Sequence, residues 1–312
     1  MRLIKRIGIG IGIDDWGLGL ICADWDWGLG LADWRIELGI QLIIKYVLDD
    51  MPLHSIISAT RQQFREASHK KMQLLTIENA KTTKGEELGY LTGILYLAPH
   101  TQSGVMNVCK FASPECARLC LYTAGMGIFK NVQDARKRKT QIFASDPVNF
   151  VEVLACDIEA LQRKAKRLGL KPAVRLNGTS DISWELFGGE KKINLMNRFP
   201  SVPFYDYTKN PSRAYASATG KLPSNYTLTF SLSEKNKAQA IKLAANGVNI
   251  AAVFSIAKKQ ELPLFTTALN VELPVINGDD HDLRFLDPKG CVVGLRAKGK
   301  ARNTSSSFIL TN

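Results

Sequence analysis

From about residue 91 onward, short apolar runs rich in β-formers alternate with helical patterns, and this alternation constrains the fold more than any other feature. Seven such runs occur, at 91–97, 173–176, 203–205, 226–230, 249–254, 274–276 and 291–295. The clearest helical patterns lie at 148–168 and 234–245. Strands that alternate with helices form parallel sheets. We therefore predict an α/β fold that is barrel-like, a complete or partial (β/α) barrel.

Two local signals support the helices. Asp146-Pro147 predicts a helix start, because Asp caps the exposed N–H groups and Pro fits the first turn. Asn246-Gly247 predicts the end of the second helix, because Gly readily adopts the left-handed conformation of a C-cap.

Polar and charged residues follow most of the predicted strands. The carboxyl ends of parallel strands meet at one edge of the sheet, where α/β proteins bind their ligands. Ser, Asp and Asn at such positions can simply cap helices or form turns, but this explains the basic residues poorly. The catalytic candidates at this edge are Asp181, Asp206, Lys209, Asp279 and His281. The candidates for binding substrate or phosphate there are Asn177, Arg284, Arg296 and Lys298.

Each residue type has a chemical reason to be there. Neighbouring carboxylates can have their pKa values pushed apart, which yields a general acid and a general base. A histidine transfers protons near neutral pH. Lysine and arginine hold phosphate or stabilise a developing anion.

Three of the six cysteines lie close together in the sequence, in a loop after the first of the seven runs. They are Cys109, Cys116 and Cys120, with the spacing C-x6-C-x3-C. Ser113-Pro114 predicts a helix start that places Cys116 and Cys120 on one helix face. Closely spaced thiolates are typical ligands of Zn²⁺ and of iron–sulfur clusters, so we predict one of these centres. Buried structural thiols and a disulfide are the alternatives.

The fourth ligand distinguishes a zinc site from an iron–sulfur cluster. Cys156, Cys291 and His100 are candidates for completing a structural Zn²⁺ site. An open fourth position instead fits a four-iron cluster that binds S-adenosylmethionine, although the usual spacing for such radical enzymes is C-x3-C-x2-C.

The charge of the chain favours a polyanionic partner. The 41 Lys and Arg exceed the 29 Asp and Glu, which gives a net charge of +12. Residues 1–71 contain nine basic and nine acidic residues, so the whole excess lies in 72–312. Nucleic acid is the first candidate for a partner of such a surface. Four consecutive bases at 136–139 cannot all face one way on a helix, and Arg136 and Lys139 are candidates for phosphate contacts on it.

The first 71 residues differ from the rest. The hexapeptide DWGLGL occurs at 15–20 and again at 26–31, and IGIGIGI at 7–13 resembles a strand weakened by glycine. We predict that 1–71 is a low-complexity, poorly ordered leader and linker, and that 72–312 is one α/β domain of catalytic type. No apolar run is long enough for a transmembrane helix.

Several separate blocks of the sequence carry a family resemblance. They include NVCKFASPECARLCLYTAGMG, RKRKTQIF, VRLNGTSDISWE, FYDYTK, YTLTFSLSE, INGDDHDLRFLDP and VGLRAKGKAR. Together they resemble the phage gene product 88 family. The resemblance covers about 72–312 and implies a phage or prophage origin and a place in the cytoplasm of the host cell.

These features lead to one main hypothesis and two alternatives. The main hypothesis is an enzyme that acts on nucleic acid or nucleotides, for example by base modification, with a metal or iron–sulfur site at the three cysteines. The first alternative is a nucleic-acid-binding protein without activity that contains structural zinc. The second is a nuclease in which Asp181, Asp206, Asp279 and Asp282 bind Mg²⁺. Aromatic residues at the strand ends can stack a base or belong to the core; they are Trp184, Tyr205, Tyr207, Phe230 and Phe285.

Overall fold

The computed structural model describes residues 10–14, 17–21, 73–77, 80–189, 192–257 and 259–311. The chain divides into two units, Met1–Ala67 and Ser68–Asn312. In the first unit, β1 (Gly10–Asp14) and β2 (Gly17–Ile21) form an antiparallel hairpin. The glycine-rich alternation thus forms a strand over its second half. The remainder of the predicted leader lies outside the described residues, so its low order stays a prediction.

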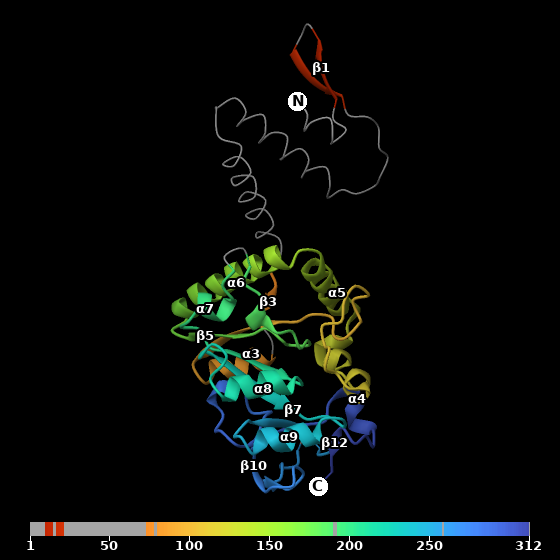
Figure 1. The fold of residues 1–312 in the computed structure, drawn as a ribbon, viewed down its shortest axis with the longest axis vertical. Helices are drawn as coiled ribbons and strands as arrows, with labels where there is room; N and C mark the ends of the chain where they lie inside the picture. Colours follow the sequence, from red (N-terminus) through yellow and green to blue (C-terminus); the bar gives the residue numbers. More distant parts are fainter. Residues whose placement is uncertain are drawn as a thin grey trace. The chain divides into compact units, whose positions relative to one another are not determined.

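The second unit contains one sheet of ten strands (Figure 1). Its pairing order is β3-β4-β5-β6-β7-β8-β11-β10-β9, and β12 also pairs with β8. The strands are β3 (Leu75–Thr76), β4 (Tyr90–Leu95), β5 (Lys171–Arg175), β6 (Phe204–Thr208), β7 (Tyr226–Ser231), β8 (Ile250–Phe254), β9 (Phe265–Thr266), β10 (Leu273–Asn277), β11 (Val292–Arg296) and β12 (Ile309–Leu310).

The predicted parallel α/β arrangement is confirmed. Each of the seven predicted strands overlaps one of β4, β5, β6, β7, β8, β10 and β11. Neighbours among these seven strands all pair in parallel. Only the ends of the pairing path are antiparallel within the described residues, where β3 pairs with β4 and β9 pairs with β10. The carboxyl ends of the seven strands therefore lie at one edge of the sheet.

The sheet is not closed, so the predicted barrel is not confirmed. In the described part of the chain, no pairing joins β3 to β9. In a closed barrel, strand side chains fill the interior. Here a loop segment around η5 (Arg284–Leu286) lies against β6 and β7, and Leu283 packs with Ala173 and Tyr205. That segment occupies the face that closure would need.

Helices cover the opposite face. The α-helices of the second unit are α3 (Ala80–Glu86), α4 (Pro114–Arg118), α5 (Lys130–Ser145), α6 (Pro147–Arg167), α7 (Leu195–Arg198), α8 (Pro211–Ala218) and α9 (Lys237–Ala244). Short 3₁₀ turns are η2 (Leu121–Thr123), η3 (Gly125–Ile128), η4 (Trp184–Leu186) and η6 (Gly299–Asn303). α6 lies against β4 and β5, and α8 lies against β6 and β7. None of the described helices is both long and apolar enough to cross a membrane.

The two predicted helix signals are confirmed. The Asp146 side chain accepts a hydrogen bond from Asn149 N at 3.0 Å, and Pro147 is the first residue of α6. After α9, Gly247 has a φ of +74° and its N–H donates to the Ala244 carbonyl. Both helix ends thus satisfy backbone groups that would otherwise lack partners.

The largest core cluster joins α6 to β4 and β5. Fully buried side chains from α6 meet those of the two strands; they are Phe150, Leu154, Ile158 and Leu161 from the helix, and Leu91, Leu95 and Val174 from the sheet. Burying one such side chain contributes about 1.5–3 kcal/mol. The long amphipathic helix therefore fixes the half of the sheet that contains β4 and β5.

Two strands pair along the same side of β8, and β11 pairs along its other side. β7 pairs with Ile250 and Ala251, and β12 pairs with Val253 and Phe254. Ile309 of β12 packs in one cluster with Leu119, Ala297 and Ala301. The C-terminal strand thus ties the cysteine loop to the carboxyl ends of the sheet.

We predict that Leu154→Ala lowers the free energy of unfolding by about 2–5 kcal/mol, because it leaves a cavity between α6 and the sheet. Leu168→Ala is the matched control, since Leu168 is 55% exposed just after the same helix, and it should change the free energy by no more than about 0.5 kcal/mol. Urea unfolding followed by circular dichroism measures both. Equal losses in the two variants would contradict the packing described above.

Candidate functional site

A cleft of about 330 Å³ opens at the carboxyl ends of β6 and β7. Its described lining comes from the cysteine loop, the turns after the two strands and the start of α9; the residues are Lys110, Phe111, Ala112, Ser113, Pro114, Lys209, Pro211, Ser233, Lys235, Asn236 and Gln239. Three of these are lysines and none is acidic. Parallel sheets bind ligands at this edge. The cleft therefore suits a ligand with negative charge.

Glu234 fixes the cysteine loop over the cleft. Its carboxylate accepts hydrogen bonds from Ser113 Oγ at 2.6 Å and from Glu115 N at 3.2 Å. The same Ser113 oxygen accepts from Cys116 N at 3.2 Å and caps α4, as Ser113-Pro114 predicts. The wall formed by the loop is thus attached to the turn after β7.

Lys209 projects from the end of β6 and lines the cleft. Its Nζ donates to Ser231 Oγ at 2.6 Å and lies 5.5 Å from the centre of the Phe308 ring. Within the described residues, no carboxylate forms an ion pair with this ammonium. The charge of Lys209 is therefore available to an anionic ligand.

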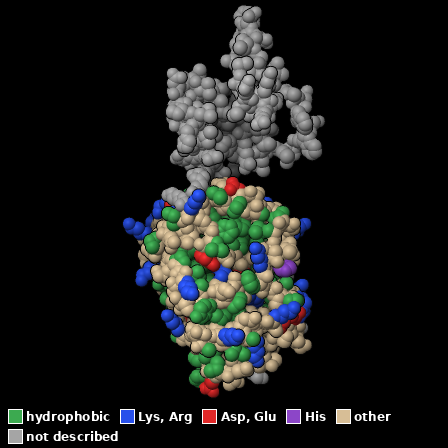
Figure 2. Space-filling view, viewed as in Figure 1, with side chains coloured by type: hydrophobic (Ala, Val, Ile, Leu, Met, Phe, Trp, Pro, Cys, Tyr) green, Lys and Arg blue, Asp and Glu red, His purple; other side chains and the backbone are tan. Residues whose placement is uncertain are grey.

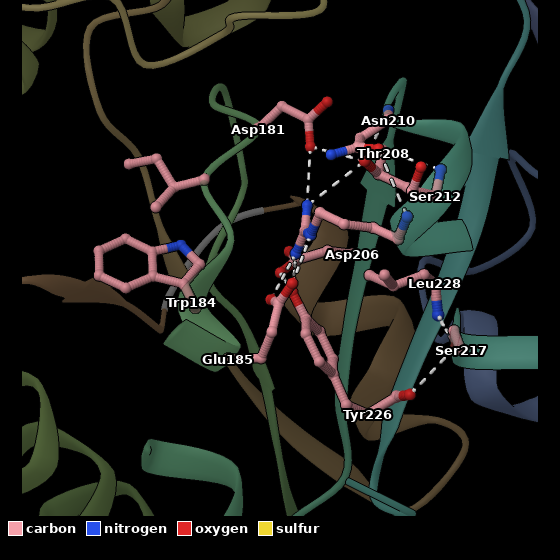
Figure 3. A network of polar contacts seen from close by, with 12 residues as sticks. Asp181, Trp184, Glu185, Asp206, Thr208, Asn210, Ser212, Ser217, Tyr226 and Leu228 are labelled. Atoms are coloured by element: carbon pink, nitrogen blue, oxygen red, sulfur yellow. Dashed lines mark hydrogen bonds and ion pairs between the residues drawn. The ribbon is translucent and has the colours of Figure 1, made fainter. Parts of the chain in front are cut away.

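A buried ion network holds the turn from which Lys209 projects (Figure 3). Asp181 accepts from Lys209 N at 2.8 Å, from Thr208 Oγ1 at 2.8 Å and from Arg213 Nη1 at 2.9 Å. Arg213 also forms a two-point ion pair with Glu185, with N–O distances of 2.7 and 2.8 Å. The structure thus brings the predicted Asp181 and Lys209 together and adds an arginine between two carboxylates.

Asn177 and Asp206 form a second network deeper in the fold. Asp206 accepts from Asn177 N at 2.6 Å, from Asn177 Nδ2 at 3.1 Å and from Tyr226 OH at 2.8 Å. Asn177 Oδ1 accepts from Ser180 Oγ and Trp184 Nε1 at 2.8 and 3.1 Å. Burial raises the pKa of Asp206 to about 7. Since Asp206 is 0% and Asn177 2% exposed, their position suits a structural role rather than contact with substrate.

The three clustered cysteines lie near one another and beside the cleft. Burial, together with charges on Cys120, Asp181 and Cys116, raises the pKa of Cys109 to about 12. Burial also raises the pKa of Cys120, although Arg136 and Lys209 favour its thiolate. His100, one of the predicted zinc ligands, lies next to the cysteine loop, because its backbone forms a hydrogen bond with Cys109.

The described part of the chain contains no assembled group of metal ligands at these thiols. There, no group of three or more His, Cys, Asp or Glu side chains is arranged to hold a metal ion. Cys291 lies at the start of β11, at the opposite edge of the sheet, where its thiol contacts Pro288 O at 3.2 Å. The zinc or iron–sulfur centre and its use of S-adenosylmethionine therefore stay predictions.

Asp279, Arg296 and Lys298 lie at the ends of β10 and β11, beyond β8 in the strand order, whereas Arg284 lies in η5 against β6 and β7. Asp279 accepts from Lys298 Nζ at 2.6 Å and pairs with Arg296 Nη1 at 3.3 Å. Burial opposes the charge of Asp279, but these bonds keep its pKa below the ordinary value. Arg284 is buried and pairs with Asp287 at 3.1 Å. The Nη2 atom of Arg284 also lies 3.2 Å from His281 Nδ1. Burial and the charge of Arg284 both lower the pKa of His281.

Two predicted phosphate contacts on α5 are partly or fully buried. Lys139 Nζ donates to the Leu74 carbonyl at 2.7 Å, and burial lowers the pKa of Lys139 to about 8. Arg136 is 8% exposed, with Tyr96 and Tyr122 beside its guanidinium. Of the two, Arg136 is the one near a clustered cysteine.

The sequence did not identify several residues that shape the site. Lys110 and Lys235 line the cleft, but neither directly follows a predicted strand. Arg213 and Glu185 form the central ion pair, yet neither directly follows a strand. The aromatic candidates Trp184, Tyr205 and Phe230 are fully buried, whereas Phe111 is 48% exposed in the cleft wall.

We predict that Asp206 makes stability depend on pH. Because its folded pKa of about 7 exceeds its ordinary 3.8, its contribution to stability is complete below about pH 4 and is lost as the pH rises through about 7. Asp206→Asn removes this ionisation. Urea unfolding between pH 4 and pH 7 should therefore show a flatter profile for the variant, although its bonds to Asn177 and Tyr226 are weakened.

Glu261→Gln is the control for this experiment, since Glu261 is exposed, and its profile should match that of the wild type. A profile of Asp206→Asn that runs parallel to the wild type would show that Asp206 has an ordinary pKa.

Comparison with known proteins gives one assignment. No curated protein and no solved structure matches the chain significantly. The family model for Gene product 88 matches residues 71–311, which includes the cleft, the cysteine loop and every strand of the ten-stranded sheet. The chain therefore belongs to the Gene product 88 family.

Proposed function

We propose that this member of the family is an enzyme that acts on a nucleic acid or a nucleotide and holds a phosphate of that substrate in the cleft at β6 and β7. The observation that carries the proposal is the grouping of Lys110, Lys209 and Lys235 in a cleft whose described lining has no acidic residue. Lysines in this arrangement attract phosphate by charge and by hydrogen bonding.

The surroundings of the cleft support a nucleotide ligand. The volume of about 330 Å³ lies within the range of small-molecule sites. Phe111 offers an exposed ring on which a base can stack. Ser113 and Ser233 also line the cleft. Lys and Arg side chains are spread over the face shown in Figure 2, where acidic ones are few, which favours a polyanion over a neutral ligand.

An enzyme is favoured over a simple binding protein because thiol and carboxylate side chains adjoin the lysines. A binder needs only positive charge and aromatic rings. Here Cys109 directly precedes Lys110, and Cys120 and Asp181 interact electrostatically with Lys209 and Cys109, respectively. Base modification is one reaction that fits such groups. The proposal does not depend on a metal ion or cluster.

The Mg²⁺-dependent nuclease receives less support. Each of its four carboxylates is held by a different partner: Asp181 by Arg213, Asp206 by Tyr226, Asp279 by Lys298 and Asp282 by Arg175. An Mg²⁺ site needs several such oxygens to converge.

Removing two exposed lysines of the cleft should weaken binding. For the double variant Lys110→Ala/Lys235→Ala we expect a loss of affinity of about tenfold at 50 mM salt, and a decrease of about one per lysine in the slope of log K against log salt. Fluorescence anisotropy with labelled DNA, labelled RNA and a fluorescent adenine nucleotide measures both quantities.

Lys166→Ala/Lys242→Ala is the matched control, because it removes the same charge from exposed positions on α6 and α9 outside the cleft lining. Equal losses in the two double variants would mean that binding follows net charge alone. No binding of any probe to the wild type would overturn the proposal. Binding without any mass change in the probe after long incubation would favour the non-enzymatic alternative.

A further inference from the structure

Two exposed cations of η6 have no partner in the described part of the chain. Lys300 and Arg302 are both exposed, and within the described residues neither side chain forms a hydrogen bond or an ion pair. Lys298, just before η6, is instead paired with Asp279 at 2.6 Å. No Asp or Glu occurs from residue 288 to the end of the chain. The charges of Lys300 and Arg302 are therefore open to an anion from solution.

The short helix α4 connects η6 to the proposed cleft. At one end of α4, Pro114 lines the cleft. At the other end, Arg118 Nη2 donates to Thr304 Oγ1, just after η6, at 3.2 Å. Leu119 packs in one cluster with Ala301 of η6, and Figure 1 shows α4 beside the C-terminal part of the chain. None of the α4 residues is buried, so the surface continues from the cleft over α4 to η6.

This surface is positive along its length. The cleft contributes three lysines and no acid. On α4, the carboxylate of Glu115 is paired with Arg118 at 2.6 Å, and Glu115 is the only acid among residues 98–133. Lys300 and Arg302 add two free charges at the far end. One phosphate occupies only the cleft, whereas an anion that also reaches η6 must carry several charges in a row.

Exposed apolar side chains lie at both ends of the same path. Phe111 is 48% exposed in the cleft wall. Leu121 is 49% exposed in η2, which contacts η6. Unpaired bases stack on exposed rings and apolar groups, whereas the bases of a duplex are already stacked on one another. A cleft of about 330 Å³ also has the size of a small-molecule site, so a strand that places a nucleotide there must be unpaired at that point.

We propose that α4 and η6 extend the cleft into a binding surface for single-stranded nucleic acid, in which Lys300 and Arg302 contact phosphates beyond the nucleotide held in the cleft. The inference rests on the proposed function for the phosphate in the cleft. It narrows the substrate of that function from a nucleic acid or a nucleotide to an unpaired polynucleotide strand.

A double variant in η6 separates the strand from the nucleotide. Lys300→Ala/Arg302→Ala should lower the affinity for a single-stranded oligonucleotide of about twelve nucleotides by about fivefold at about 50 mM salt. The slope of log K against log salt should fall by about 0.7 for each cation removed. The affinity for a fluorescent adenine nucleotide should not change, because that probe reaches only the cleft. Fluorescence anisotropy of the full chain measures all three, and circular dichroism establishes that the variant is folded.

Lys166→Ala/Lys242→Ala again removes the same charge from exposed positions outside this surface. Equal losses of strand affinity in the two double variants, or no loss in Lys300→Ala/Arg302→Ala, would overturn the inference.

The same oligonucleotide annealed to its complement tests the choice of a single strand. The duplex should bind about tenfold more weakly, because its paired bases neither stack on Phe111 nor enter the cleft. Equal or tighter binding of the duplex would overturn the inference. A strand that binds no more tightly than the nucleotide would also overturn it and leave the cleft intact. Unchanged nucleotide affinity in Lys110→Ala/Lys235→Ala, together with a weaker strand complex in Lys300→Ala/Arg302→Ala, would contradict the cleft and support the surface at η6.

Discussion

The arrangement of the strand ends depends on the hydrogen bonds that the buried carboxyl group of Asp206 accepts. Through Asn177 it holds the loop after β5, and through Tyr226 OH it reaches the first residue of β7. Tyr226 OH in turn accepts from Arg213 Nη2 at 3.0 Å, and Arg213 bonds Asp181, which accepts from Lys209 N. A continuous series of hydrogen bonds thus runs from the interior of β6 to the lysine in the cleft.

Each donor in this series needs its acceptor, because several of the groups are charged and buried. Arg213 has two carboxylate neighbours, Asp181 and Glu185, and Asp206 adds a third acid two bonds away. Burial raises the pKa of Asp206 to about 7, which reduces this excess of negative charge near neutral pH, although the bonds from Asn177 and Tyr226 favour the charged form. Breaking a buried pair costs about 3–5 kcal/mol because one charge is left alone. The network therefore gives the cleft a fixed backbone.

The alternation of side chains along β6 explains why Lys209 reaches the cleft and Asp206 does not. The sequence predicts a strand over 203–205 followed by a polar Asp206, but β6 continues to Thr208. Alternate residues of a strand point to the same face, so Asp206 points with Phe204 toward the helices and not to the sheet edge. Lys209 lies just past the true end of β6 and does reach the cleft. An error of three residues in one strand end thus decides which side chain reaches the ligand.

Long-range packing explains the two larger differences. Apolar alternation predicts all seven parallel strands, because each run buries its residues locally. It does not predict closure, since the loop around Leu283 competes for the face that a barrel would enclose. The cleft likewise combines Lys110, Lys209 and Lys235 from three segments, and no spacing in the sequence brings these together. Only the fixed order of the strands places them at one edge.

The pairing of the other cations gives meaning to Arg136 and Lys209. Several cations of the second unit are paired with acids: Arg175 with Asp282, Arg198 with Glu152, Arg213 with Glu185, Arg284 with Asp287, and Arg296 and Lys298 with Asp279. Arg136 and Lys209 have aromatic rings beside them instead of carboxylates. An aromatic ring holds a cation in place without neutralising it. Lys209 is therefore positioned by the protein while its charge stays available to a ligand in the cleft.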